Sequence, residues 1–313
     1  MKRTSVRATV LAAITGLAMT VLGLPAEAAP GPAVHRAADT PAKAKAVSGY
    51  WTAEAMRSAI PLDKLLQAPR GVLKDVAKGL GTVIPQSVPN GGGAWTGGGK
   101  VTKTAGRVFF TFNGRKASCS GDAVTSTNGS VVVTAGHCVK YQGTWHTDWV
   151  FVPGYDNGNA PYGQWTASKT LTTPQWEASE DMNYDVGMAV VNQLDGKRLT
   201  DVVGAQGIAF NQARNQTMYT FGYPAAAPYD GTKLIYCSGP TITDFLLTQD
   251  HGMGCNMTGG SSGGPWFLNF DEATGTGVQA SVNSFGYTFL PNYMFGPYFG
   301  ADAQTLYGKA QAG

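Results

Sequence analysis

Short runs of apolar and β-branched residues, separated by turn-forming pairs, dominate the chain from about residue 105 onward. Asn113-Gly114 and Asp195-Gly196 are typical of the turns between such runs. The runs are Arg107–Phe112, Val131–Thr134, Trp149–Val152, Val186–Val191, Met218–Gly222 and Val278–Val282. Many short strands without intervening helices favour an all-β fold, a sandwich or barrels. Only the last residues, around Asp302–Tyr307, have a helical pattern.

The N-terminus has a different pattern. Three basic residues precede an apolar run, Ala8–Leu24, which ends at Pro25 and the small-residue site Ala26–Ala28. This arrangement predicts a secretory signal peptide over residues 1–28. A membrane anchor is the alternative, but the run is shorter than the ~20 residues that a span needs. We therefore expect a secreted, extracellular protein with no membrane segment in its mature form.

Residues 29–100 change character twice. An Ala/Lys/Pro-rich stretch contains Thr52–Ala59, which predicts a short helix with a Thr cap that stops before Pro61. The run Gly91–Gly99 follows and predicts a flexible, exposed linker. We expect residues 29–100 to be a propeptide with this Gly-rich linker, ahead of a folded domain over residues 101–313. An N-terminal extension that is never removed remains the alternative.

Composition and charge narrow the class of protein. Gly accounts for 42 of 313 residues, about twice the usual share, and only 14% of residues are charged. The net charge of +3 divides unevenly, because residues 1–100 hold 12 Lys/Arg and 5 Asp/Glu whereas the remainder holds 11 and 15. The main domain is thus mildly acidic, and we expect no nucleic-acid partner.

The four cysteines form two local pairs, Cys119 with Cys138 and Cys237 with Cys255. None has the C-x-x-C spacing of a zinc site, so we expect no metal. An even number of cysteines at these spacings in an exported chain predicts two disulfides.

Three short segments carry the candidate chemistry. His137 follows an apolar strand, Asp185 precedes another buried run, and Ser262 lies in Gly259–Pro265 with glycines on both sides. A serine hydroxyl needs a base to accept its proton, and a buried carboxylate can orient a histidine for that task. The backbone N–H groups of Gly260 and Ser262 can converge on a developing oxyanion. Together the segments predict nucleophilic acyl transfer.

Chain order excludes one alternative. Gly260–Gly264 fits the G-x-S-x-G pattern of α/β-hydrolases, but in that fold the catalytic His follows the Ser. All four histidines of this chain precede Ser262. The subtilisin order would need an Asp before His137 and alternating helices, which the pattern does not offer.

The sequences TAGHC around His137 and GSSGGP around Ser262, with Asp185 between them, resemble the chymotrypsin-like serine endopeptidases over roughly residues 105–313. The resemblance implies two six-stranded antiparallel β-barrels with the active site in the cleft between them. It implies that His137 is the general base, Asp185 its orienting partner and Ser262 the nucleophile. It also assigns substrate-backbone pairing to Ser284, Phe285 and Gly286. The Cys119–Cys138 pair is similar to the family's disulfide that braces the histidine loop.

Two departures from the family pattern matter. Ser261 stands where animal members have the Asp that receives the freed N-terminus, so latency would come from a propeptide covering the cleft. Cys255, seven residues before Ser262, is more similar to the bacterial glutamyl endopeptidase branch. Members of that branch recognise Glu partly through a His, and Asn283 stands in its position here.

The specificity pocket remains open at this stage. Asn256, six residues before Ser262, stands where trypsin-like enzymes have the Asp that binds Lys or Arg, so strict tryptic cleavage is not expected. Met257 and Thr258 would line the same wall. An uncharged pocket favours neutral or apolar side chains, but Asn and Thr donors could also accept a carboxylate.

These observations predict a secreted serine endopeptidase, made as a signal-propeptide precursor and acting as a monomer on protein or peptide substrates. We expect no cofactor, and the protein's own propeptide as its inhibitor or folding aid. A catalytically silent binding protein of the same fold is one alternative. An esterase that uses the same three residues is the other.

Overall fold

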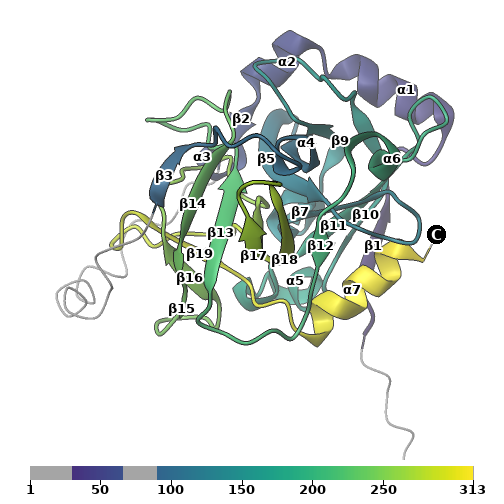
Figure 1. Ribbon diagram of the computed structural model, residues 1–313. Coiled ribbons are helices and arrows are strands. Elements are labelled where there is room, and N and C mark those ends of the chain that lie inside the picture. Colours follow the sequence, from purple (N-terminus) through teal and green to yellow (C-terminus); the bar gives the residue numbers. More distant parts are fainter. Residues whose placement is uncertain (1–29, 66–89, 313) are drawn as a thin grey trace, which may run out of the picture. The chain divides into compact units, whose positions relative to one another are not determined.

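The computed structural model describes residues 30–65 and 90–312 (Figure 1). The predicted signal peptide, residues 1–28, and the middle of the predicted propeptide, residues 66–89, lie outside the described residues. All features below lie within Gly31–Gly313, which forms one unit.

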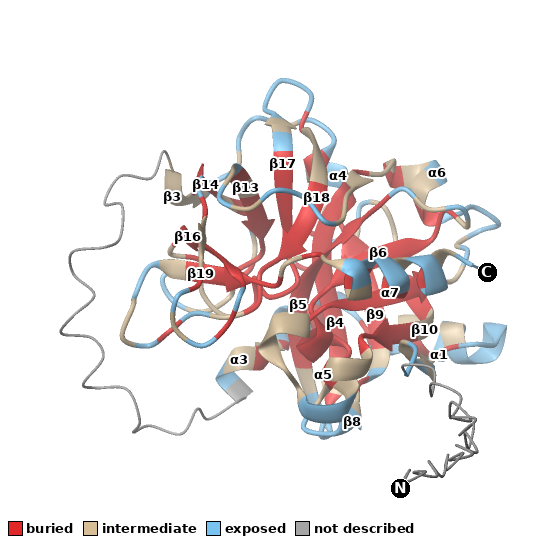
Figure 2. Cartoon of the chain, turned by 90° about the horizontal axis from the view of Figure 1, so that it is seen from below, coloured by how far each residue is buried: buried red, intermediate tan, exposed pale blue. Residues whose placement is uncertain are grey.

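Six antiparallel strands close into a barrel that forms the first half of the fold. They are β4 (Ala105–Phe112), β5 (Arg115–Ala123), β6 (Val131–Thr134), β9 (Thr147–Pro153), β10 (Trp165–Thr172) and β11 (Gly187–Val191). The order is β10-β11-β6-β5-β4-β9, and pairing of β9 with β10 closes the ring. These strands are buried along most of their length, as Figure 2 shows. The predicted runs at Arg107–Phe112, Val131–Thr134, Trp149–Val152 and Val186–Val191 are confirmed as strands.

The second half is also built from strands, which divide between two sheets. The larger sheet has the order β12 (Gly207–Ile208), β18 (Thr276–Val282), β17 (Pro265–Asp271), β13 (Thr217–Gly222), β14 (Ile235–Pro240) and β3 (Asn90–Ala94). The smaller sheet contains β15 (Ile242–Thr243), β16 (His251–Gly254) and β19 (Tyr293–Gly296). Shifts in register between β17 and β18 bend this region. The predicted all-β, chymotrypsin-like fold class is confirmed.

Helices are few and short. The predicted helices are confirmed as α2 (Ala53–Ser58), whose N-cap Thr52 accepts from Ala55 N, and the C-terminal α7 (Ala301–Gln311). Five further helices in the described residues were not predicted: α1 (Pro41–Tyr50), α3 (Leu62–Leu65), α4 (Val101–Thr104), α5 (Pro174–Ser179) and α6 (Leu199–Val203). The last four span only one or two turns and leave no readable period. No helix in the described ranges is long and apolar enough to cross a membrane.

The Gly-rich run differs from the predicted exposed linker. Gly91–Gly93 belong to β3, which pairs with β14 at the edge of the larger sheet. The ring of Trp95 packs against Phe221, Tyr236 and Phe270 at centroid distances of 5.0–5.6 Å. Glycines leave the backbone free to pair at the edge of a sheet, and the packing of Trp95 holds the strand in place. Composition alone does not predict either contact.

Residues 31–65, which we call the leader segment, pack against the first barrel. The strand β1 (Ala33–Arg36) extends the barrel sheet at β10, and β2 (Ile60–Pro61) pairs with β5. Between them lie α1 (Pro41–Tyr50) and α2, which Figure 1 shows in purple, and α3 (Leu62–Leu65) follows. We call residues 101–312 the peptidase body.

Candidate active site

His137 lies in a single 3₁₀ turn, Gly136–Cys138, directly after β6. The predicted disulfide Cys119–Cys138 is confirmed and ties this turn to β5; Cys237–Cys255 is confirmed as well. A Cβ on Gly136 would lie 2.9 Å from Asp185 Oδ1 and from the Trp176 ring. Glycine at this position therefore lets the carboxylate reach the backbone of the histidine turn.

Three ring N–H groups hold the carbonyls of this segment. His146 Nε2 donates to His137 O at 2.8 Å, Trp149 Nε1 to Cys138 O at 3.0 Å, and Trp176 Nε1 to Lys140 O at 2.8 Å. All three rings are buried. These positioning residues could not be predicted from the sequence, because each lies 9 to 36 residues beyond the carbonyl that it holds and belongs to no motif.

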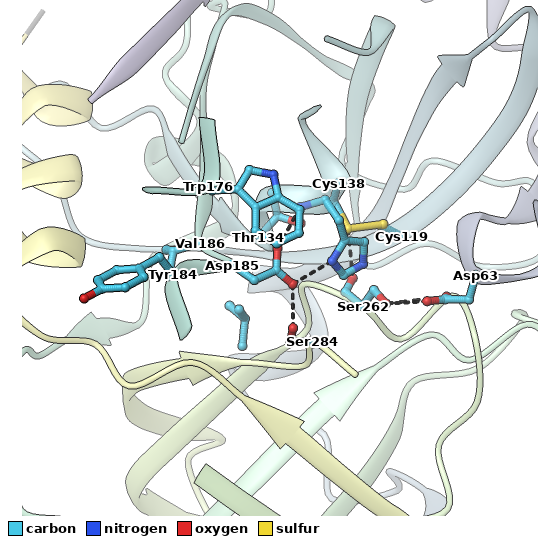
Figure 3. A network of polar contacts seen from close by, with 12 residues as sticks. Asp63, Cys119, Thr134, Cys138, Trp176, Tyr184, Asp185, Val186, Ser262 and Ser284 are labelled. Atoms are coloured by element: carbon cyan, nitrogen blue, oxygen red, sulfur yellow. Dashed lines mark hydrogen bonds and ion pairs between the residues drawn. A yellow bond between two sulfur atoms is a disulfide. The ribbon is translucent and has the colours of Figure 1, made fainter. Parts of the chain in front are cut away.

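Asp185 is fully buried and accepts three hydrogen bonds from the site. His137 donates through its backbone N to Oδ1 at 2.8 Å and through Nδ1 to Oδ2 at 2.7 Å. The hydroxyl of Ser284 donates to Oδ2 at 2.5 Å, as Figure 3 shows. Ser284 was predicted to pair with substrate backbone, and its contact with the carboxylate could not be read from the sequence. These bonds fix the imidazole with its proton on Nδ1.

Charge and burial act in opposite directions on His137. Burial, the largest single effect, lowers the pKa of the imidazole, whereas the charge and hydrogen bond of Asp185 raise it. The carboxylates of Asp63 and Glu180 add to the rise, so the pKa of His137 ends above its ordinary value. Among the described residues, Nε2 of His137 has no hydrogen-bond partner. Asp185 thus orients the imidazole through Nδ1, and the Nε2 atom of the same ring remains able to accept a proton.

Ser262 lies in the loop before β17, pressed against the first barrel. A Cβ on Gly263, which has φ +80°, would lie 2.1 Å from Thr134 Oγ1, so only glycine allows this approach. Ser120 N donates to Ser262 O at 2.7 Å and holds the loop. The neighbouring Ser261 hydroxyl is buried and donates to Thr258 O at 2.9 Å. Of the two adjacent serines, Ser261 is the one whose hydroxyl is tied to a backbone carbonyl, whereas the hydroxyl of Ser262 contacts the side chain of Asp63.

A leader carboxylate meets the Ser262 loop. Ser262 Oγ lies 3.4 and 3.5 Å from the two carboxylate oxygens of Asp63, and Gly260 N donates to Asp63 Oδ2 at 3.1 Å. Figure 3 shows Asp63 facing Ser262 on the side away from Asp185. This contact was not predicted, because Asp63 lies 199 residues before Ser262 and in no recognisable motif.

A cavity of about 660 Å³ opens beside Ser262. Five of the six residues predicted to bind substrate line it: Met257, Thr258, Ser284, Phe285 and Gly286. Tyr293 and Met294 of β19 also line it and were not predicted. Apart from Asp63 of the leader segment, its lining residues are uncharged.

Two residues discussed for the pocket lie elsewhere. Asn256 is not among the residues that line the cavity; its Oδ1 accepts from Tyr229 OH at 2.6 Å, and Gly92 of β3 passes over it. Asn283 is fully buried, accepts from Thr220 and Trp266, and donates to the Phe221 and Ser261 carbonyls. Neither side chain contributes a polar group to the cavity beside Ser262.

Comparison with known proteins defines the family. No protein-family model and no curated protein sequence matches the chain. Among solved structures, the protease Anisep from Arthrobacter nicotinovorans has 46% identity and a TM-score of 0.64, over 67% of this chain and 96% of that chain. The thermostable serine protease AL20 from an extremophilic microorganism has 44% identity and a TM-score of 0.64, over 68% and 98%.

The chain therefore belongs to the serine proteases of chymotrypsin-like fold, and the predicted peptidase class is confirmed. A Glu endopeptidase, solved in complex with MPD, has 17% identity and a TM-score of 0.57, over 72% of this chain and 98% of that chain. At that identity the likeness is one of fold alone.

Proposed function

We propose that the protein is a secreted serine endopeptidase in which His137, Asp185 and Ser262 form the catalytic triad. The observation that carries this proposal is the hydrogen bond of 2.7 Å from His137 Nδ1 to the buried Asp185, with Nε2 left without a partner among the described residues. Such an imidazole can accept a proton from the serine hydroxyl.

The proposed reaction follows from these positions. Ser262 Oγ attacks the scissile carbonyl carbon as its proton passes to His137 Nε2, and the backbone N–H groups of Gly260 and Ser262 stabilise the oxyanion. The imidazolium, supported by Asp185, returns the proton to the leaving amine and an acyl-enzyme remains. A water molecule then gives up a proton to the imidazole and attacks the ester carbon. As the ester bond breaks, the imidazolium passes that proton to Ser262 Oγ, which releases the acid and restores the serine.

The substrate class follows from the cavity beside Ser262. Met257, Phe285, Tyr293 and Met294 provide an apolar lining, and the described peptidase-body residues of the cavity include no cation that could pair with a carboxylate. An unpaired charge is costly to bury in such a site. Of the two options that the sequence leaves open, we propose cleavage after uncharged, apolar side chains.

Export and processing are part of the same proposal. The basic, apolar and small-residue pattern over residues 1–28 supports secretion, and the two disulfides are typical of an oxidising compartment. We propose that residues 29–100 act as a propeptide and that the mature enzyme is a monomer. N-terminal sequencing and light scattering of the secreted protein test these two points.

Cleavage of a peptide library, mapped by mass spectrometry, tests the activity and the pocket together. We expect cleavage after Phe, Leu or Met at least about 10-fold faster than after Glu or Lys, because a charged side chain would lack a partner. Ser262→Ala should abolish turnover while keeping the fold, and Ser179→Ala, which removes an exposed hydroxyl in α5, should not change it. Preferred cleavage after Glu would contradict the pocket assignment, and full turnover by Ser262→Ala the triad.

The two alternatives make different predictions. A catalytically silent binding protein of this fold would cleave no library member, and an esterase would hydrolyse esters but not peptides. Ester and peptide substrates with the same acyl group, compared at equal concentration, separate these cases.

A further inference from the structure

The leader segment shares a hydrophobic core with the peptidase body. The ring of Trp51 is fully buried, lies 5.4 Å from the ring of Phe109, and donates through Nε1 to Asp148 O at 2.6 Å. Other apolar side chains of the segment pack with the same cluster: Ala38, Val47, Ala55, Met56 and Ala59. The body contributes Phe109, Val150, Val152, Tyr155 and Tyr223. Burial of this kind holds the segment in one register.

Two strand pairings with the first barrel fix the direction in which the leader segment runs toward the site. β1 pairs antiparallel with β10, and β2 pairs parallel with β5 through Ile60 with Ala117 and Pro61 with Ser118. Leu62, which follows, is fully buried in the core of the first barrel. Asp63 follows Leu62 directly, and it is the residue of the leader segment that lines the cavity beside Ser262. The segment uses the β5 edge, not the edge Ser284–Gly286 that is expected to pair with substrate.

The group that reaches Ser262 is a side-chain carboxylate. Gly260 N–H, the expected oxyanion donor, is bound to Asp63 Oδ2 at 3.1 Å, and both carboxylate oxygens lie within 3.5 Å of Ser262 Oγ. A carboxylate matches the negative charge that an oxyanion site is built to bind. Its carbon carries no amine leaving group, so attack by Ser262 could cleave nothing.

We propose that the leader segment inhibits the peptidase body by placing the Asp63 carboxylate at the oxyanion site. Its pairing with β10 and β5 and the packing of Trp51 on Phe109 hold it there. The proposal rests on the proposed function and specifies how the same site is regulated. Inhibition then depends on a single carboxylate presented by a docked segment, and within residues 31–65 no strand pairs with the edge Ser284–Gly286.

The rate at which a serine-directed phosphonate labels the intact full-length precursor tests this proposal. We expect Asp63→Ala to be labelled at least about 10-fold faster than the wild type, because a charge-assisted hydrogen bond and a blocking group are lost. Asp63→Asn should be intermediate, since it keeps an acceptor but loses the charge. The control Glu54→Gln alters an exposed leader carboxylate in α2 and should be labelled like the wild type. Intact mass identifies the uncut chain.

A second measurement does not depend on turnover. In the Ser262→Ala background, which cannot process itself, Asp63→Ala should lower the pKa of His137 followed by NMR, because the Asp63 charge is one of its causes of elevation beside Asp185 and Glu180. Equal labelling of wild type and Asp63→Ala, with the processed enzyme labelled normally, overturns the inhibitor proposal alone. Absence of labelling in every form overturns the triad, and the inhibitor proposal with it.

Discussion

At the scale of single residues, the site depends on a carboxylate held by three donors. Asp185 accepts from two groups of His137 and from the hydroxyl of Ser284. The sequence identified the aspartate and the histidine because they lie in short motifs. The contact of Ser284 depends on a loop 99 residues further along the chain and became visible only in the fold.

Ser284→Ala tests this third donor. We expect kcat to fall about 10-fold, because a hydrogen bond to a charged group is lost where Asp185 must stabilise the imidazolium. The matched control is Ser281→Ala, which removes a buried hydroxyl bonded to Pro297 O outside the site. Steady-state kinetics should show a kcat effect for Ser284→Ala alone. Equal kcat in both variants would show that Ser284 acts only on stability.

At the scale of elements, the sequence predicts several strands, but it does not predict which distant segments pair with them. Val131–Thr134 was predicted with the bounds that the structure gives it, because a short apolar run between turn signals has few other interpretations. In the sequence, the run Gly91–Gly99 predicts a linker, because glycines provide no side-chain pattern and the partner β14 is distant in sequence. Docking of the leader segment likewise depends on surfaces that only the folded barrel presents.

The two disulfides allow a comparison between elements. Their sequence separations are 19 and 18, so removing either pair by Cys→Ala substitution should lower the free energy of unfolding by about 3 kcal/mol. Only Cys119–Cys138 holds the turn that carries His137. We therefore expect its removal to reduce kcat as well. Urea denaturation and kinetics measure both effects, and an unchanged kcat would show that the ring N–H contacts suffice to hold the turn.

At the scale of the whole molecule, buried titratable groups set the pH range of stability. Burial lowers the pKa of His146 to about 3 and of His251 to about 4, so the unfolded chain binds more protons than the folded one below its histidine pKa of about 6.5. Stability should therefore fall as the pH drops through this range. Burial raises the pKa of Asp250 to about 8 and that of Asp122 well above its usual range.

These two carboxyls, and His137 with its raised pKa, act in the opposite direction. The folded state keeps protons that the unfolded state has lost, so stability falls as the pH rises toward 8. We expect the free energy of unfolding to be greatest between about pH 4 and 6.5. Urea denaturation of Ser262→Ala, which avoids autolysis, measures this profile.

Two variants assign the alkaline side of the profile. Asp250→Asn should flatten the fall between pH 6.5 and 8, because the amide does not titrate. Asp195→Asn, in an exposed turn, should leave the profile unchanged. A stability that rises steadily up to pH 8 would contradict this account.

The measurement that tests the central claim most directly is the location of a phosphonate adduct in the processed enzyme, by peptide mapping and tandem mass spectrometry. Two serines stand side by side, and the structure buries the hydroxyl of Ser261 against Thr258 O, whereas the hydroxyl of Ser262 lies 3.4 Å from Asp63 Oδ1 at the cavity. We predict a single adduct on Ser262. In Asp185→Asn, the rate at which this adduct forms should fall by about four orders of magnitude. An adduct on Ser261, or labelling that does not depend on Asp185, would contradict the account.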